Sequence, residues 1–179
     1  MKLKGIPLFH KGRIAAALAA LLAIPLAQAD VLRIGVATAG GGDPVTFSGS
    51  TLGIVRNQQL LEKAFAGTGT EVQWFFFKGA GPAVNEALSN QQLDFAYQGD
   101  LPAVVGRSNG LDTRLLAALG VRANLYLAVP KGSELKSIED LKGKKVAVFR
   151  GTNGHLVTIN LLAAHGLTER DIKVINLDT

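Results

Sequence analysis

Short alternating or apolar runs along the chain are separated by stretches in which apolar residues recur with helical spacing. The runs predict strands at 31–36, 71–77, 93–97, 113–119, 124–130, 145–149 and 172–177. The spacing predicts helices at 52–67, 81–88, 100–106 and 154–166, the first and last ending at Gly67 and Gly166. Strands that alternate with helices indicate βαβ units, so the predicted fold class is α/β with a mainly parallel sheet.

Two shorter segments have the spacing of a capped helical turn. Ser137 and Asp140 form one S/T-x-x-D pattern, and Thr168 and Asp171 form a second. Trp74 and the phenylalanines at 75–77 lie within a predicted strand, which favours a place in the core over a role in binding.

The pattern of strands and helices restarts after a polar, lysine-rich stretch at 130–145, which is typical of a domain boundary. We therefore predict a first lobe at 30–129 and a partial second lobe at 130–179. A lobe of about 50 residues is marginal for an independent core. Because the sequence stops directly after a strand, we expect the protein to continue beyond Thr179.

The N-terminal segment has the pattern of an export signal. A basic start is followed by an apolar run at 14–26 and by the small-residue sequence Ala27-Gln28-Ala29. The run is shorter than the roughly 20 residues of a membrane-spanning helix. We predict a signal peptide at 1–29 that is cleaved after Ala29, and hence a periplasmic protein; an uncleaved membrane anchor is the alternative.

Removal of this segment changes the charge argument. The whole chain has a net charge of +5, and four of its basic residues lie before Asp30, which leaves about +1 for the remaining 150 residues. Without a basic stripe that contains aromatic residues, no nucleic-acid partner is expected. The chain has no cysteine and three scattered histidines, so we expect no disulfide, metal site or other cofactor.

The most suggestive turn is RGTNGH at 150–155, between a predicted strand and a predicted helix. Neither G-x-x-x-x-G-K-[S/T] nor G-x-G-x-x-G is present, which argues against a nucleotide. Two interpretations remain. Thr152 or Asn153 caps an ordinary helix start, or the free N–H groups and the helix dipole bind a small anion.

Three stretches resemble one known family: GPAVNEALSNQQLDFAYQGDLPAV (81–104), AVPKGSELKSIEDLKGKKVAV (128–148) and RGTNGHLV (150–157). In them the chain resembles the periplasmic binding proteins of ABC importers for aliphatic sulfonates, taurine and nitrate. The resemblance extends from 32–36 to 174–178. It implies the two-lobed, type II periplasmic binding protein fold. Family members are about twice this length, so the second lobe is expected to be truncated.

In this family the ligand lies between the lobes, at turns that follow the carboxyl ends of strands. The turns that match are 38–51, 98–102 and 150–155. The resemblance thereby implies that the ligand-binding residues are Thr46, Ser48, Ser50, Gly99, Asp100, Thr152, Asn153, Gly154 and His155. The first turn is longer and richer in glycine than in common members. The alternative to a ligand-binding role for this turn is a surface loop whose hydroxyl groups face water.

Two of these residues have competing roles. Asp100 is expected to cap the short helix that follows it, and the alternative is an ion pair with a ligand ammonium group. His155 either donates to a ligand oxygen as a neutral imidazole or faces solvent at a helix start. Arg122 and Arg150 are candidates for positive charge near the cleft.

The resemblance implies a transport receptor that captures a small anionic or zwitterionic ligand and delivers it to an ABC permease in the inner membrane. A monomer without enzymatic activity is expected. Two alternatives stay open. The first is an enzyme on the same fold, of the sulfinate desulfinase or thiamine-pyrimidine precursor synthase type. Those enzymes use cysteine, and no His–carboxylate pair can be placed here. The second is a periplasmic sensor module.

Overall fold

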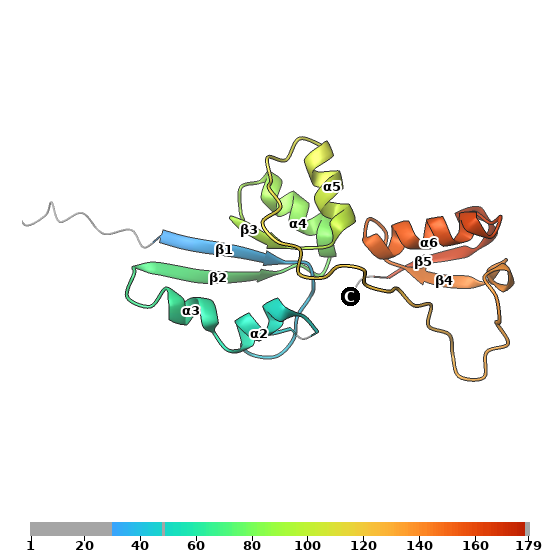
Figure 1. Ribbon diagram of the computed structural model, residues 1–179, viewed down its shortest axis with the longest axis horizontal. Helices are drawn as coiled ribbons and strands as arrows, with labels where there is room; N and C mark the ends of the chain where they lie inside the picture. The colour runs from blue at the N-terminus through green and yellow to red at the C-terminus, as the bar shows by residue number, and fades with distance from the viewer. Residues whose placement is uncertain (1–29, 48, 178–179) are drawn as a thin grey trace, which may run out of the picture.

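Two separate parallel sheets form the framework of the protein (Figure 1). The computed structural model describes residues 30–47 and 49–177. The first sheet has the strand order β2-β1-β3 and consists of β1 (Asp30–Val36), β2 (Thr70–Phe76) and β3 (Phe95–Tyr97). The second sheet pairs β4 (Lys145–Val148) with β5 (Lys173–Asn176). All strand pairs are parallel, which confirms the predicted α/β class.

Helices cover both faces of the first sheet and one face of the second (Figure 1). On one side of the first sheet lie α2 (Thr51–Asn57) and α3 (Leu60–Ala64), and on the other lie α4 (Ala80–Ser89) and α5 (Asp100–Ser108). The second sheet is accompanied by η1 (Glu139–Leu141), α6 (Asn153–Ala164) and η2 (Glu169–Asp171). The carboxyl ends of the strands in the two sheets point toward each other, which sets the place of the site.

The core of the first sheet lies under α4. Val84 and Ala87 of α4 are buried with Leu93, and Ala37 and Phe77 pack against them. A Cβ atom at Gly35 would collide with the Leu93 side chain, so glycine at this position lets the strand and the loop before β3 pack closely.

The second sheet has its own apolar cluster, formed by Leu141, Val146, Val148, Leu162, Leu167 and Ile172. Both predicted capping turns lie beside it. The complete capping box between Thr168 and Asp171 is present, and its hydrogen bonds lower the pKa of Asp171. In the other turn, Asp140 accepts the backbone N–H groups of Lys136 and Ser137, both at 2.9 Å.

One predicted helix is interrupted. The segment at 52–67 forms α2 and α3 because Gln59 adopts a left-handed conformation, with φ of 53°. The apolar spacing continues across this break, since both short helices pack on the same side of the sheet. Periodicity alone therefore did not reveal it.

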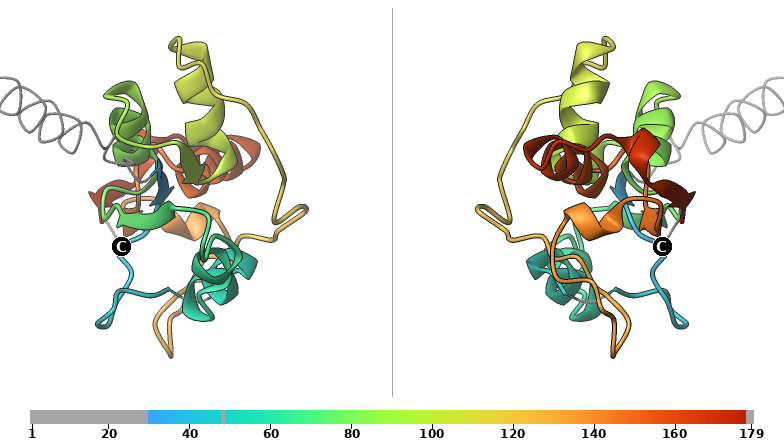
Figure 2. Two further views of the ribbon diagram at one scale, coloured as in Figure 1. Left: turned by 90° about the vertical axis from the view of Figure 1, so that its left-hand side faces the viewer. Right: turned by 90° about the vertical axis from the view of Figure 1, so that its right-hand side faces the viewer.

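Two predicted strands, 113–119 and 124–130, are wrong. The chain between Leu111 and Lys136 contains no helix or strand, and it runs along one side of the molecule (Figure 2). A strand requires a hydrogen-bonded neighbour, and the described residues provide none here. The apolar side chains that suggested strands remain exposed, with Leu115 at 84% and Tyr126 at 85% of their full accessibility.

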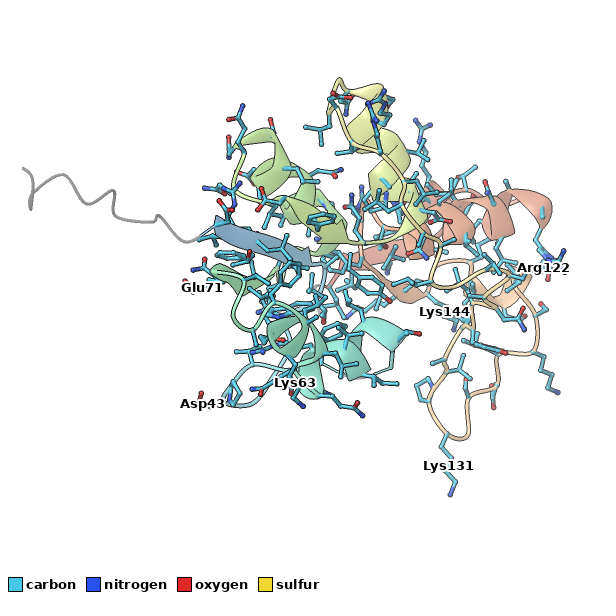
Figure 3. All side chains as sticks on the ribbon, turned by 60° about the vertical axis from the view of Figure 1, so that its left-hand side comes forward. Asp43, Lys63, Glu71, Arg122, Lys131 and Lys144 are labelled. Carbon is cyan, nitrogen blue, oxygen red and sulfur yellow. The ribbon has the colours of Figure 1, made fainter. Side chains whose placement is uncertain are left out.

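Charged side chains lie at the periphery, as Lys63, Glu71 and Lys131 illustrate (Figure 3). Arg33 and Asp94 form the best-defined ion pair, at 2.7 Å, and join β1 to the residue before β3. The hydrogen bond from Arg33 lowers the pKa of Asp94. No helix among the residues that the structure describes is long and apolar enough to cross a membrane.

Leu162 offers a test of the second core. It is fully buried, whereas Leu156 on the same helix is 41% exposed. We expect Leu162→Ala to lower the free energy of unfolding by about 2–5 kcal/mol and Leu156→Ala by less than about 1 kcal/mol. Amide hydrogen exchange of β4 and β5 measures this difference. Equal exchange rates in the two variants would contradict the assignment of the core.

Candidate functional site

The starts of three helices meet at one cavity between the two sheets. Its volume is about 280 Å³. Helix α4 contributes its first turn, α5 its N-cap and first turn, and α6 its N-cap and first turn. The lining residues are Ala37, Ala80, Gly81, Gly99, Pro102, Leu125, Phe149, Thr152, Asn153 and Gly154.

Strand geometry explains why these helix starts converge. Ala37 directly follows β1, Gly99 follows β3 by two residues, and Phe149 directly follows β4. Parallel strands end at a common edge, and the next helix begins there. Because the two sheets point their carboxyl ends at each other, both sets of turns face the same cavity (Figure 1).

The turn between β4 and α6 lines this cavity and contains unpaired backbone donors. Thr152 holds the N-cap position with an extended backbone, and its carbonyl accepts the N–H groups of His155 and Leu156. The N–H groups of Thr152, Asn153 and Gly154 have no acceptor among the described residues. These are the groups that a helix start leaves unpaired, and that suit an anion.

The side chain of Thr152 does not cap the helix. Its Oγ1 donates instead to the carbonyl oxygen of Phe149, at 2.7 Å, and α6 has no side-chain cap. Thr152 thus holds the N-cap position that the interpretation of the RGTNGH turn as a capped helix start predicts, but without a capping hydrogen bond from its side chain. Because the Thr152 hydroxyl group bonds to Phe149 and does not accept from the helix, the first N–H groups of α6 remain available.

Glycines allow the two sheets to approach across the cavity. A Cβ atom at Gly99 would lie 3.3 Å from Oδ1 of Asn153, and one at Gly151 would lie 2.9 Å from Cγ of Pro82. Gly151 also has a φ of 78°, which favours glycine. The turn after β4 and the start of α6 are therefore in near contact with the first turn of α4 and with the turn after β3.

None of the ten lining residues is charged. The electrostatic character of the cavity comes from the N-terminal ends of α4, α5 and α6, which carry partial positive charge. The described residues include no group of histidines and acidic residues that could hold a metal ion. The arrangement therefore suits hydrogen bonding to an anion.

Four of the predicted ligand residues come together at this cavity: Gly99, Thr152, Asn153 and Gly154. Asp100 lies beside it as the first residue of α5. Its Oδ1 accepts the N–H of Leu101 at 2.7 Å, while Gly99 holds the N-cap position. The expectation that Asp100 itself is the N-cap is therefore wrong by one residue, because Asp100 is already the first helical residue of α5.

Two other predicted residues, Thr46 and Ser50, do not line the cavity. Thr46 donates to the carbonyl oxygen of Gly41, and Ser50 caps α2 by accepting the N–H of Gly53. These hydroxyl groups stabilise the first loop and the helix after it. Ser48 lies outside the described residues.

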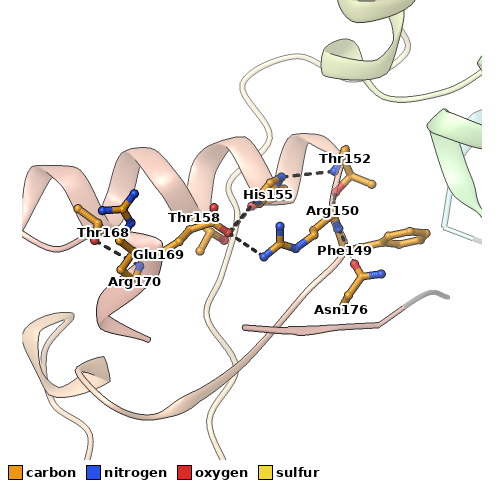
Figure 4. Close-up of polar contacts among 11 residues, drawn as sticks. Phe149, Arg150, Thr152, His155, Thr158, Thr168, Glu169, Arg170 and Asn176 are labelled. Atoms are coloured by element: carbon orange, nitrogen blue, oxygen red, sulfur yellow. Dashed lines mark hydrogen bonds and ion pairs between the residues drawn. The ribbon is translucent and has the colours of Figure 1, made fainter. Parts of the chain in front are cut away.

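His155 and the two candidate arginines also point elsewhere. The imidazole of His155 contacts Gly151 and Glu169 within its own part of the chain (Figure 4). Arg150 lies 3.8 Å from Glu169, and Arg122 is exposed (Figure 3). None of the three lines the cavity.

Sequence reasoning missed six lining residues. Ala37 and Phe149 directly follow strands, so the rule that ligands bind at strand ends could have found them. Ala80, Gly81 and Pro102 belong to helix starts that face the same edge. Leu125 lies in a coil that was expected to be a strand, and no local signal indicates its position.

Comparison with known proteins gives consistent matches. Residues 56–178 match the family model described as ABC transporter, phosphonate, periplasmic substrate-binding protein. The chain is 32% identical over 162 residues to a protein of Escherichia coli (strain K12) that is named for binding aliphatic sulfonates, with 84% of this chain and 49% of that protein covered. A protein of the same name from Bacillus subtilis (strain 168) is 34% identical over 130 residues, with 72% and 39% covered.

Solved structures give the same result. The alkanesulfonate-binding protein SsuA of Xanthomonas axonopodis pv. citri, bound to MOPS, superposes with a TM-score of 0.61 at 30% identity. That match covers 85% of this chain and 49% of the other. A periplasmic sulfonate-binding protein SsuA from Methylobacillus flagellatus KT gives 0.57 at 36% identity, covering 84% and 46%. The chain thus spans about half the length of the proteins that it matches.

The uncharged cavity allows a direct electrostatic test. Asn153→Asp changes little in size but places a carboxylate among the three helix starts. At about 5 Å from a bound anion, such a charge opposes binding by about 3 kcal/mol at an effective dielectric constant of about 20. We expect the affinity for a small oxyanion such as sulfate, measured by calorimetry, to fall at least about tenfold.

Asn160→Asp is the matched control, because it adds the same charge on an exposed position of α6 outside the cavity. It should change the affinity less than about twofold. Similar losses in both variants would contradict the placement of the anion at this cavity.

Proposed function

The chain belongs to the family of periplasmic substrate-binding proteins of ABC transporters, and from that premise we propose that it captures an aliphatic sulfonate for delivery to a membrane permease. The observation that supports this most is the meeting of three helix starts at one uncharged cavity. Backbone N–H groups and helix dipoles can hold a sulfonate group there without a cationic side chain.

The cavity has polar helix starts on one part of its wall and apolar side chains on another, which supports an organic ligand. Ala37, Leu125 and Phe149 add apolar surface beside the helix starts. A volume of about 280 Å³ equals that of about nine water molecules. Nitrate would fill only part of this space and leave the apolar side without a partner. A short alkyl chain attached to a sulfonate would occupy both sides.

The proposal includes the two lobes predicted from the sequence, at 30–129 and 130–179. The cavity receives walls from both parts: Gly81 and Gly99 from the first, and Thr152 and Asn153 from the second. A ligand that contacts both walls would stabilise the arrangement in which they lie close together. We propose that the permease recognises this ligand-bound arrangement in a monomeric receptor.

The names of the matched proteins support the same ligand class. The Xanthomonas protein is bound to MOPS, a molecule that carries a sulfonate on an alkyl chain. The family model is named for phosphonate instead. The two anions differ in charge and protonation, so a direct comparison of them belongs in the test.

The ligand class can be tested with a series of linear alkanesulfonates, together with butylphosphonate, taurine, nitrate and glutamate. We expect the sulfonates to bind best, with affinity that rises with chain length, since each buried methylene contributes up to about 0.8 kcal/mol. Phe149→Ala should reduce this dependence on chain length more than it reduces methanesulfonate binding. Isothermal titration calorimetry measures both quantities.

Phe75→Ala is the control, because Phe75 is exposed on β2 and does not line the cavity. It should leave the chain-length dependence unchanged. Binding of glutamate but of no sulfonate would show that the ligand class is wrong. A preference for butylphosphonate over butanesulfonate would favour the anion in the name of the family model.

Export is a second part of the proposal. The basic start and Ala27-Gln28-Ala29 indicate a signal peptide at 1–29, a segment that lies outside the described residues. Expression in a bacterium with a periplasm should yield a soluble periplasmic protein whose N-terminus is Asp30, as measured by mass spectrometry. Recovery of the intact Met1 form from the membrane fraction would contradict export by a cleaved signal.

A further inference from the structure

The imidazole of His155 is engaged on both ring nitrogens. Nδ1 lies 3.4 Å from the backbone nitrogen of Gly151, and Nε2 lies 3.0 Å from Oε1 of Glu169 (Figure 4). The side chain is only 17% exposed. His155 is therefore held inside the RGTNGH turn, with its ring away from the cavity lining.

These contacts determine which nitrogen carries the proton. A backbone N–H can only donate, so Nδ1 must accept and is unprotonated. The proton of the neutral ring then lies on Nε2 and is donated to Glu169, whose carboxylate also lies 3.8 Å from Arg150. Both ends of the imidazole are thus fixed by partners of opposite hydrogen-bonding character.

The bond to Gly151 affects the donors at the cavity. Three successive residues of the turn form hydrogen bonds within this part of the chain. The N–H of Arg150 donates to Oδ1 of Asn176 at 3.0 Å, and the N–H of Gly151 donates to Nδ1 of His155. The hydroxyl group of Thr152 donates to the carbonyl oxygen of Phe149. The next N–H groups, of Thr152, Asn153 and Gly154, have no acceptor among the described residues. The hydrogen bonds behind the turn thereby orient the peptides that face the cavity.

We propose that His155 is a positioning residue, which holds the Gly151 peptide through Nδ1 so that the N–H groups at 152–154 point into the cavity. It acts on the ligand through the backbone and makes no contact with it. Glu169 maintains the tautomer on which this depends. The binding part of the inference rests on the proposed function, whereas the hydrogen-bond pattern does not.

Nitrogen-15 NMR of the ligand-free protein tests the pattern. The His155 ring should show the neutral form with the proton on Nε2, and the Gly151 amide proton should correlate with Nδ1. A proton on Nδ1 would overturn the proposal. On saturation with MOPS, the Asn153 and Gly154 amides should shift strongly. A new hydrogen bond from His155 to the ligand would overturn it as well.

Two substitutions separate the two ring contacts. His155→Asn keeps an acceptor at the position of Nδ1 and loses the contact with Glu169. His155→Gln places its amide near the position of Nε2 and loses the acceptor for Gly151. We expect His155→Gln to weaken MOPS binding by about tenfold and His155→Asn to recover most of that loss. Equal losses in the two variants, or a greater loss in His155→Asn, would overturn the proposal.

His165→Gln is the matched control, since His165 follows the same helix and pairs with Glu139 at 2.7 Å outside the cavity. It should leave MOPS binding unchanged. In His155→Gln the amide resonances of Thr152, Asn153 and Gly154 should move, while those of β4 and β5 stay in place. If the unaltered protein binds no sulfonate, the proposed function fails, and the NMR pattern still decides the positioning role.

Discussion

The rest of the structure depends on the close approach of two turns, one after each sheet. Gly99 packs against Asn153 and Gly151 packs against Pro82, so that a Cβ atom at either glycine would meet its neighbour at a tighter than usual distance. Only this approach brings the starts of α4, α5 and α6 to one cavity. Each sheet alone presents part of a wall, so the capacity to surround an anion belongs to the pair.

The cavity that we propose as the anion site has no cationic side chain among its lining residues. A lysine or arginine would attract any negative group and would lose hydration when buried. Peptide N–H groups at a helix start are already oriented by the helix, so little reorganisation is required when the ligand arrives. In the function that we propose, selectivity depends on the number and direction of these donors and on the apolar wall formed by Leu125 and Phe149.

Local patterns predicted most of the fold correctly. Strand 31–36 became β1, the helix at 154–166 became α6, and the Thr168–Asp171 turn formed its capping box, because each depends on neighbours in the sequence. The strands at 113–119 and 124–130 failed because a strand also needs a partner that local pattern does not supply. Four of the nine predicted ligand residues line the cavity, at turns where helices follow strands, whereas Leu125 reaches the cavity through tertiary structure that no local pattern indicates.

His155 illustrates a further limit of residue-by-residue inference. A histidine at the start of a helix beside an anion site is a reasonable ligand from its chemistry alone, since a neutral ring can donate. The role that we propose for it depends on a residue fourteen positions away, because the contact with Glu169 engages Nε2 outside the cavity lining. The same constraint makes Nδ1 an acceptor for Gly151. In our proposal, a side chain that the sequence places next to a ligand therefore acts by holding the backbone and not by contacting the ligand.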